Sequence, residues 1–244
     1  MLQWLPILLL KSFFVSDSSD TMKYVYFNSN FEAESEIEYV TFMGLPKRLY
    51  KNKYEITFYT LDGNKVAFGE YKGHGLKNKS GVFVRYFPDG SVASTAVFKK
   101  SLLTGVYQRY FSNGVLADSG LFWRNYSKGV WKTWHYNGQL MNIRNYTIRK
   151  GRVNINSLLD GEYKSWFSSG KLKDSGFFKL NEREGVWLEY LEEGEIKSIG
   201  QYKNNWKIGD WKFYDKNGKL LYLRRYKKYR YDAVGERIEI KTKQ

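Results

Sequence analysis

A glycine period constrains this chain more than any other feature of its sequence. Six pairs of glycines recur, and in each pair the second glycine follows the first by nine residues. The first glycines are Gly81, Gly105, Gly129, Gly161, Gly185 and Gly209, and the second glycines are Gly90, Gly114, Gly138, Gly170, Gly194 and Gly218. The step is 24 residues throughout, apart from one step of 32 residues. Such a period is typical of an array built from copies of one small unit.

Aromatic residues keep the same period. The residues two positions after the first glycine are Phe83, Tyr107, Trp131, Tyr163, Trp187 and Trp211. The residues five positions after it are Tyr86, Tyr110, Trp134, Trp166, Tyr190 and Tyr214. The odd spacing between the two columns places them on opposite faces of a regular strand. We expect the structural residues of the repeat to be Gly105, Tyr107, Gly114, Gly129, Trp131, Gly138, Gly185, Trp187, Gly194, Gly209, Trp211 and Gly218.

Each copy is predicted to form one β-hairpin. In four copies Asp89, Asn113, Asn137 or Asn217 precedes the second glycine, and Asp-Gly or Asn-Gly is a strong hairpin signal because both residues tolerate positive φ. One hairpin cannot bury its own aromatic residues, so successive copies must stack. The sequence therefore predicts an all-β fold, an elongated antiparallel sheet of stacked β-hairpin repeats.

A third glycine recurs in part of the array, six positions after the second. It is present as Gly69, Gly120, Gly176 and Gly200, but Ala96, Arg144 and Arg224 occupy this position in other copies. A glycine inside a strand often marks the close approach of another group. We expect an aromatic side chain from a neighbouring strand to lie over it.

The repeated residues resemble a known family. The cycle Gly129, Trp131, Trp134, Gly138 and Leu140, repeated from Gly209 to Leu220, resembles the MORN repeat in its bacterial variant form. The resemblance covers about residues 54 to 226 and implies extended sheets of β-hairpins. Many bacterial members of this family carry the label of YwqK-type antitoxin, which would imply a toxin as partner and a cytoplasmic location.

The repeats divide the chain. The array is expected over residues 54–230, with six clear copies from 81, a degenerate copy from 54 and an insertion near 147–160. Residues 21–53 form a lead-in region and residues 231–244 a C-terminal tail. Residues 1–20 contain the apolar run from Trp4 to Leu10, which favours a signal peptide and export to the periplasm or cell envelope. A buried first strand or helix is the alternative, and the protein would then be cytoplasmic.

Positive charge is concentrated in the second half of the chain. The net charge is +15, and residues 101–244 carry 27 basic and 15 acidic residues. Two groups are candidate binding residues, namely Arg149, Lys150 and Arg152 in the insertion, and Arg224, Arg225, Lys227, Lys228 and Arg230 in the last copy. Both have structural alternatives, because an insertion is often a tolerated surface loop and a charged last hairpin discourages further strand pairing.

Few residues suit catalysis. Cysteine is absent and there are two histidines, His74 and His135, without recognisable partners. Glu189, Glu192, Glu193 and Glu195 cluster around one turn, where a polar hairpin tip is a simpler explanation than a glycosidase pair. We therefore expect no enzyme activity, no cofactor, no metal and no small-molecule substrate.

The expected function is a non-catalytic scaffold that binds a macromolecular partner in the bacterial cell envelope. A protein partner is favoured, because exposed Tyr and Trp together with basic residues are common at interaction hot spots. An anionic lipid or envelope polymer, bound through the basic half, is the second hypothesis, and an intracellular antitoxin-like protein is the third. Nucleic acid is disfavoured because no recognition motif accompanies the charge.

Overall fold

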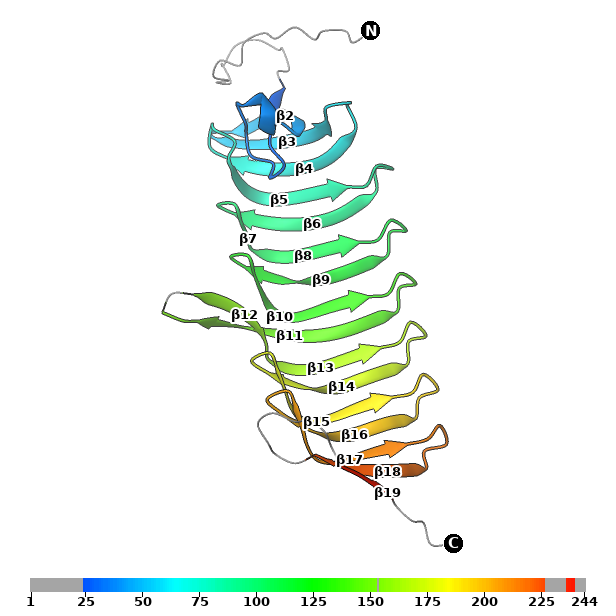
Figure 1. Cartoon of the computed structure of the whole chain (residues 1–244). Coiled ribbons are helices and arrows are strands. Elements are labelled where there is room, and N and C mark those ends of the chain that lie inside the picture. Colours follow the sequence, from blue (N-terminus) through cyan, green and yellow to red (C-terminus); the bar gives the residue numbers. More distant parts are fainter. Residues whose placement is uncertain (1–23, 153, 227–235, 240–244) are drawn as a thin grey trace. The chain divides into compact units, whose positions relative to one another are not determined.

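The computed structural model describes residues 24–152, 154–226 and 236–239. The chain divides into two compact units, Met1–Gly105 and Val106–Gln244. Across the described residues the strands pair antiparallel and the one helical element is a 3-10 turn, η1 (Ile37–Tyr39), so the all-β hairpin fold is confirmed (Figure 1). The apolar segment expected as a signal peptide lies outside the described residues.

The first unit contains seven strands in chain order. They are β1 (Val25–Phe27), β2 (Phe42–Tyr50), β3 (Lys53–Thr60), β4 (Lys65–Lys72), β5 (Asn78–Tyr86), β6 (Val92–Lys99) and β7 (Leu102–Leu103). The lead-in region forms β1 and β2, and β2 pairs with β3, the first strand of the degenerate copy. Phe31 covers this part of the sheet, because its ring packs against Phe42, Phe58 and Phe83. Its carbonyl oxygen accepts a 2.6 Å hydrogen bond from the hydroxyl of the fully buried Tyr71.

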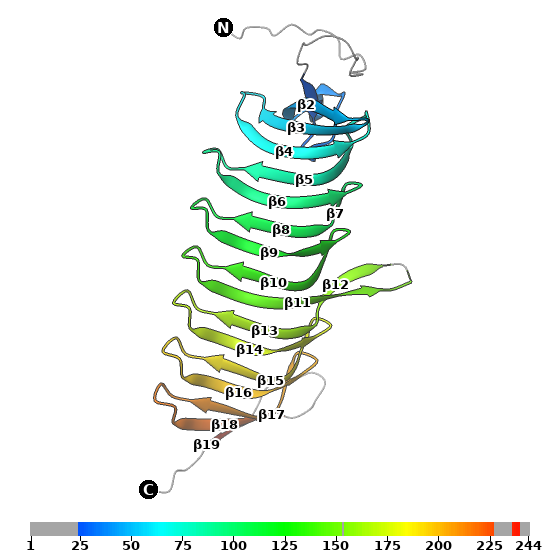
Figure 2. The same ribbon diagram turned by 180° about the vertical axis from the view of Figure 1, so that it is seen from behind.

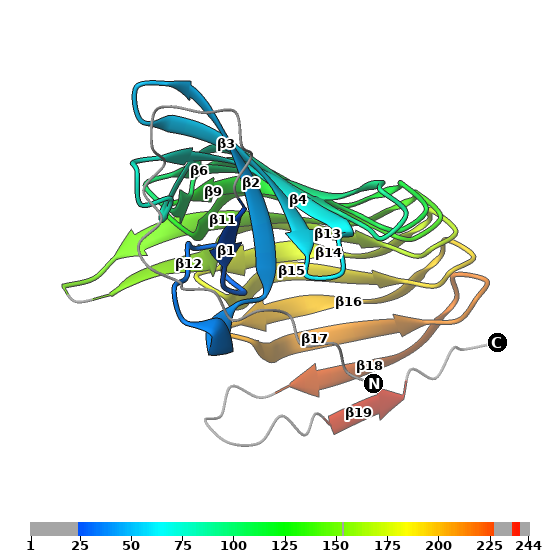
Figure 3. The same ribbon diagram turned by 90° about the horizontal axis from the view of Figure 1, so that it is seen from above.

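The second unit continues the hairpins with the strands β8 (Gly105–Tyr110), β9 (Leu116–Trp123), β10 (Tyr126–Trp134), β11 (Leu140–Lys150), β12 (Ile155–Leu159), β13 (Gly161–Trp166), β14 (Leu172–Lys179), β15 (Glu182–Tyr190), β16 (Ile196–Lys203), β17 (Trp206–Tyr214), β18 (Leu220–Tyr226) and β19 (Glu236–Glu239). From β13 to β18 each strand lies beside the next one in the chain (Figure 2). The 32-residue step lengthens β11, so the β11–β12 hairpin projects from the side of the sheet (Figure 3).

The turn inside each copy contains the second glycine, as expected for a hairpin. In the copy with Asn113, the N–H of Gly114 donates to the carbonyl of Phe111, and the N–H of Phe111 donates to the carbonyl of Val115. Gly114 has φ 81°, and Asn113 is not among the residues with positive φ, so the glycine alone uses the conformation that both residues tolerate. The Asn113 side chain instead accepts the N–H of Val115 at 3.1 Å. This is a type I turn followed by a left-handed glycine.

Turns with two left-handed residues occur between copies, at the other edge of the sheet. Arg124 and Asn125 have φ of 50° and 71°, and Leu180 and Asn181 have φ of 52° and 73°. The second residue also links neighbouring copies, because Oδ1 of Asn181 accepts the N–H of Leu159 at 2.6 Å. Asn205 accepts the N–H of Arg183 in the same way at 2.7 Å.

The expected aromatic cover over the third glycine is confirmed. A Cβ at Gly120, Gly176 or Gly200 would collide with the indole ring of Trp131, Trp187 or Trp211, respectively, and a Cβ at Gly69 would collide with Phe83. In the copies that follow Ala96 and Arg144 the covering position holds Tyr107 and Tyr163. Every tryptophan of this column therefore follows a copy that carries glycine.

Candidate binding surfaces

One face of the second unit carries the first aromatic column, and we call it the aromatic face. Its rings meet mainly edge to face, with centroids 5.2 Å apart for Phe178 and Trp187 and 5.1 Å apart for Tyr202 and Trp211. Trp187 is 3% exposed and Trp211 is 0% exposed. Edge-to-face packing suits the charge distribution of aromatic rings, and this ladder supplies the core that a single sheet otherwise lacks.

The opposite face carries an apolar row that the sequence reasoning missed. Side chains alternate along a strand, so Val130 lies opposite Trp131, and Val186 lies opposite Trp187. Both valines are 49% exposed. The apolar row of the second unit consists of Val106, Leu121, Val130, Phe177 and Val186. Its signal in the sequence is valine directly after the first glycine in three copies of this unit.

The predicted basic tip lies at the end of the β11–β12 hairpin. Arg149, Lys150 and Arg152 are all exposed. The Nζ atom of Lys150 lies 5.1 Å from the ring centroid of Trp123, at the end of β9. Ser157 on β12 donates a 2.6 Å hydrogen bond to the carbonyl of Ser127, which fixes the base of the hairpin on β10. The described residues of the insertion therefore form a hairpin that presents three cations.

The predicted C-terminal basic group is not one cluster. Arg224 and Arg225 are successive residues of β18 and lie on opposite faces. Arg225 forms a two-pronged ion pair with Asp210, at 2.7 and 3.0 Å, and this partner lowers the pKa of the Asp210 carboxyl. Lys227, Lys228 and Arg230 lie outside the described residues. β18 is also not the exposed edge that we expected, because β19 pairs with it from Tyr222 to Arg225.

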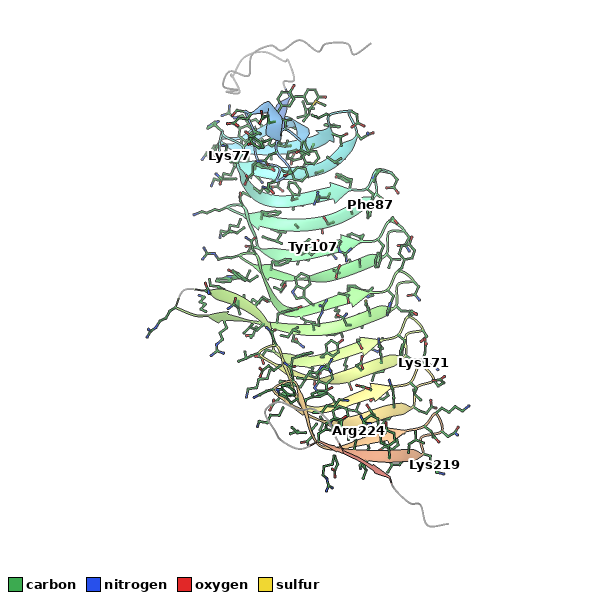
Figure 4. The ribbon with its side chains drawn as sticks, in the orientation of Figure 1. Lys77, Phe87, Tyr107, Lys171, Lys219 and Arg224 are labelled. Atoms are coloured by element: carbon green, nitrogen blue, oxygen red, sulfur yellow. The ribbon has the colours of Figure 1, made fainter. Side chains whose placement is uncertain are left out.

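Three cations lie on the aromatic face at the C-terminal end of the array, and two of them were not singled out from the sequence. The Arg183 guanidinium carbon lies 4.8 Å from the ring centroid of Trp187, and Lys207 Nζ lies 3.9 Å from that of Trp211. Arg224 is the third, 5.9 Å from the ring of Tyr222. Figure 4 shows Arg224 over the sheet, whereas Lys171 and Lys219 lie at the edge formed by the hairpin tips. Arg183 and Lys207 share the position two residues before the first glycine.

Both histidines and Glu189, one of the four glutamates considered for chemistry, have structural partners. Nε2 of His135 donates to the carbonyl of Trp166 at 3.0 Å, and Nδ1 of His74 lies 2.9 Å from the hydroxyl of Tyr54. Glu189 accepts a 3.0 Å hydrogen bond from Ser198. In the part of the chain that the structure describes, no group of three or more acidic or histidine side chains could hold a metal ion. No described helix has the length and apolar character needed to cross a membrane.

Comparison with protein families identifies the repeat. Four segments match the MORN repeat variant. They are residues 128–147, 159–180, 183–204 and 207–228. The matched MORN repeat variants start at β10 and include both tryptophan–glycine pairs formed by Trp187 and Trp211. The resemblance seen in the sequence is thus confirmed for the repeat type over these four segments.

Comparison with solved structures gives weak likenesses. A chain of the Photorhabdus luminescens Tc holotoxin pore is 11% identical, with a TM-score of 0.20, and the match covers 82% of this chain and 13% of that chain. A chain of TcdB2-TccC3 is 10% identical, with a TM-score of 0.22, and the match covers 83% and 15%. The protein therefore spans a small part of the length of these structures. No curated protein matches the sequence.

Proposed function

We propose that this protein is a non-catalytic binding module and that it holds a protein partner against the apolar row of the second unit. The observation that carries the proposal is the repeated exposure of Val106, Leu121, Val130, Phe177 and Val186 on one face of the sheet. Single exposed apolar residues are normal on a protein surface, but several of them gathered on one face favour an interaction site.

The surroundings of the row favour a protein over other apolar partners. Lys132 on β10 and Lys164 on β13 are exposed on the same face as the row, and Glu162 pairs directly with Phe177. Protein interfaces commonly have an apolar centre with a polar rim, and charges at the rim set orientation and association rate. A sheet face with this pattern suits a partner of mixed surface chemistry.

The test compares two pairs of substitutions in the full-length chain. Val130→Lys with Val186→Lys adds two charges to the apolar row, and Ser112→Lys with Ser169→Lys adds the same charge at the exposed hairpin tips. A partner would be cross-linked in the source cells, purified, and titrated against each protein. We expect the valine variant to bind the partner about tenfold more weakly or worse, because substitutions at the centre of an interface cause losses of this size. Equal affinity for wild type and the valine variant would contradict the proposal.

A second candidate function rests on the basic hairpin tip. The exposure of Arg149, Lys150 and Arg152 beside Trp123 supports binding of an anionic lipid or envelope polymer. Replacing the three cations by glutamine should release the full-length protein from vesicles that contain anionic lipid, and raised salt should do the same. Unchanged association with these vesicles would exclude this role for the tip.

The compartment belongs to the same proposal. The apolar run from Trp4 to Leu10 supports export, and the bacterial cell envelope is the compartment we propose. Mass spectrometry of the protein from its source would test this directly. Loss of the apolar run would support export, whereas an intact Met1 in the cytosolic fraction would favour an intracellular partner, including a toxin.

A further inference from the structure

We propose that Arg183, Lys207 and Arg224 form a binding site for the carboxylates of an acidic protein segment, on the aromatic face of the last repeats. This site goes beyond the proposed function, because it lies on the face opposite to the apolar row and recognises charge. We call it the cation cluster. Each of its members lies beside aromatic rings that are themselves held in place by the repeat.

Geometry brings the three cations together from three strands. In the strand register Arg183 on β15 is opposite Phe178, Lys207 on β17 is opposite Tyr202, and Arg224 on β18 is opposite Trp211. Directly opposed residues share a face, so all three side chains lie on the aromatic face. β15 and β17 are two strands apart, roughly 10 Å in an antiparallel sheet. The cluster therefore extends over adjacent copies of the repeat.

The aromatic rings hold the cations in defined positions. Arg183 lies between Trp187 and Tyr202, at 4.8 and 5.2 Å from the ring centroids, and also donates a 3.0 Å hydrogen bond to the hydroxyl of Tyr202. Lys207 lies over Trp211 at 3.9 Å. Cation–π contacts restrict these long side chains, so less conformational entropy is lost when a ligand binds.

Arg224 has hydrogen-bonding capacity left over. Its Nε atom is buried and forms no hydrogen bond with any described residue. Its guanidinium carbon lies 6.0 Å from the ring of Phe213 and 5.9 Å from that of Tyr222. A buried, unpaired donor on a charged group is unfavourable, and a change of the Arg224 rotamer that lets Nε donate to a bound carboxylate would remove this penalty.

The electrostatic environment also favours an anion. Burial lowers the pKa of Lys207, and the charges of Arg183, Arg224 and Lys197 lower it further, whereas Glu189 raises it. Glu189 is already engaged by the hydroxyl of Ser198 at 3.0 Å. Three cations thus repel one another in a partly dehydrated setting, and a bound carboxylate would relieve this repulsion.

A carboxylate-bearing segment suits the cluster better than an isolated anion. A guanidinium binds a carboxylate through two parallel hydrogen bonds, and two arginines are available. The cations are spread over adjacent repeats, so an extended chain with several acidic residues can engage more than one of them. Residues 101–244 contain 27 basic and 15 acidic residues, and this excess of positive charge adds long-range attraction for such a segment.

The experiment titrates full-length protein with a synthetic peptide of alternating glutamate and serine, and with its glutamine counterpart, by calorimetry. Arg183→Gln, Lys207→Gln and Arg224→Gln are combined in one variant. The control variant combines Lys171→Gln, Lys216→Gln and Lys219→Gln, which removes the same charge at the exposed hairpin tips. We expect wild type and control to bind the glutamate peptide and the cluster variant to bind about tenfold more weakly or worse. Equal losses in both variants would overturn the site in favour of a general charge effect.

A second measurement uses wild-type protein, so its result does not depend on whether the triple variant folds. Addition of the glutamate peptide to wild-type protein should shift the Nε–H signals of Arg183 and Arg224 in a nitrogen-15 spectrum, assigned with Arg183→Lys and Arg224→Lys. Unmoved signals at saturating peptide would overturn the proposal. Tighter binding of tripolyphosphate than of the peptide would overturn the assignment to carboxylates.

Discussion

Trp211 packs its indole ring onto the backbone of Gly200, and its Nε1–H donates a 3.2 Å hydrogen bond to the carbonyl of the next residue, Gln201. Trp131 and Trp187 repeat the arrangement, with hydrogen bonds to Leu121 and Phe177. The glycine makes room for the ring, and the following carbonyl satisfies the indole nitrogen. Each such pair joins one copy of the repeat to the next.

Gly200→Ala should destabilise the second unit. The added Cβ would overlap the indole of Trp211, so the ring must move out of its packed position and weaken its hydrogen bond. Overpacking of this kind costs about 1 to 3 kcal/mol. Urea unfolding followed by tryptophan fluorescence measures the change. Gly75→Ala is the matched control, because a Cβ at Gly75 has open space, and an equal loss in both variants would contradict this explanation.

Trp187→Ala should be more damaging than Trp206→Ala. Trp187 is 3% exposed within the aromatic ladder, whereas Trp206 is 49% exposed at a turn. Truncation of a buried tryptophan costs about 3 to 5 kcal/mol, and truncation of an exposed one much less. Thermal unfolding monitored by circular dichroism gives both values. Wild-type stability of Trp187→Ala would mean that the aromatic face is not the core.

Tyr71→Phe should destabilise the first unit. The Tyr71 side chain is fully buried and its hydroxyl donates to the carbonyl of Phe31 at 2.6 Å, so the substitution leaves this carbonyl without its partner. The expected loss in the free energy of unfolding is about 1 to 3 kcal/mol. Tyr50→Phe, at an exposed turn, serves as control and should unfold like wild type.

Alkaline pH should destabilise the first unit through the same residue. Burial raises the pKa of Tyr71 above its ordinary value of 10.0. The folded state therefore favours the neutral phenol, and stability is intact below pH 10 and falls as the pH rises above that value. Urea midpoints of wild type and Tyr71→Phe, measured on either side of pH 10, provide the test. The variant should lose less stability than wild type as the pH rises through this range. An equal loss in both proteins would show that Tyr71 does not cause the alkaline destabilisation.

Asn181 offers a test of the turns between copies. Its φ is 73°, and its side chain accepts the N–H of Leu159. Asn181→Gly keeps the left-handed backbone and removes the hydrogen bond, whereas Asn181→Ala removes both. We expect losses of about 1 kcal/mol for glycine and about 2 kcal/mol for alanine. Equal stability of the two variants would show that the backbone conformation contributes nothing here.

The period, the hairpins and the tryptophan–glycine packing could be predicted because each depends on residues that recur at fixed spacing. The turns between copies could not, because Arg124 and Leu180 occupy left-handed positions that a sequence argument reserves for glycine or asparagine. Here the pairing of the flanking strands imposes the conformation, as Trp123 is held opposite Tyr126.

The candidate surfaces were predicted less well than the fold. The valines of the apolar row were missed because the aromatic columns are the stronger pattern in each repeat. Arg224 and Arg225 were grouped because they are adjacent in the sequence, although adjacent residues of a strand lie on opposite faces. Arg183 and Lys207 lie in different repeats, so their proximity depends on how the copies stack. The pairing of β18 with β19 joins segments separated by residues outside the repeat pattern, and no period indicates it.

The tryptophan–glycine pairs also decide which copies of this array could be lost or gained during evolution. Deleting residues 185–208 would bring Gly176 under Trp211 and leave a junction of the existing kind. Deleting residues 161–184 would place Arg144 under Trp187, where the aliphatic part of the arginine side chain would overlap the indole ring. We therefore expect the first deletion to keep the packing between neighbouring copies and the second to disrupt it, although both deletions preserve the period.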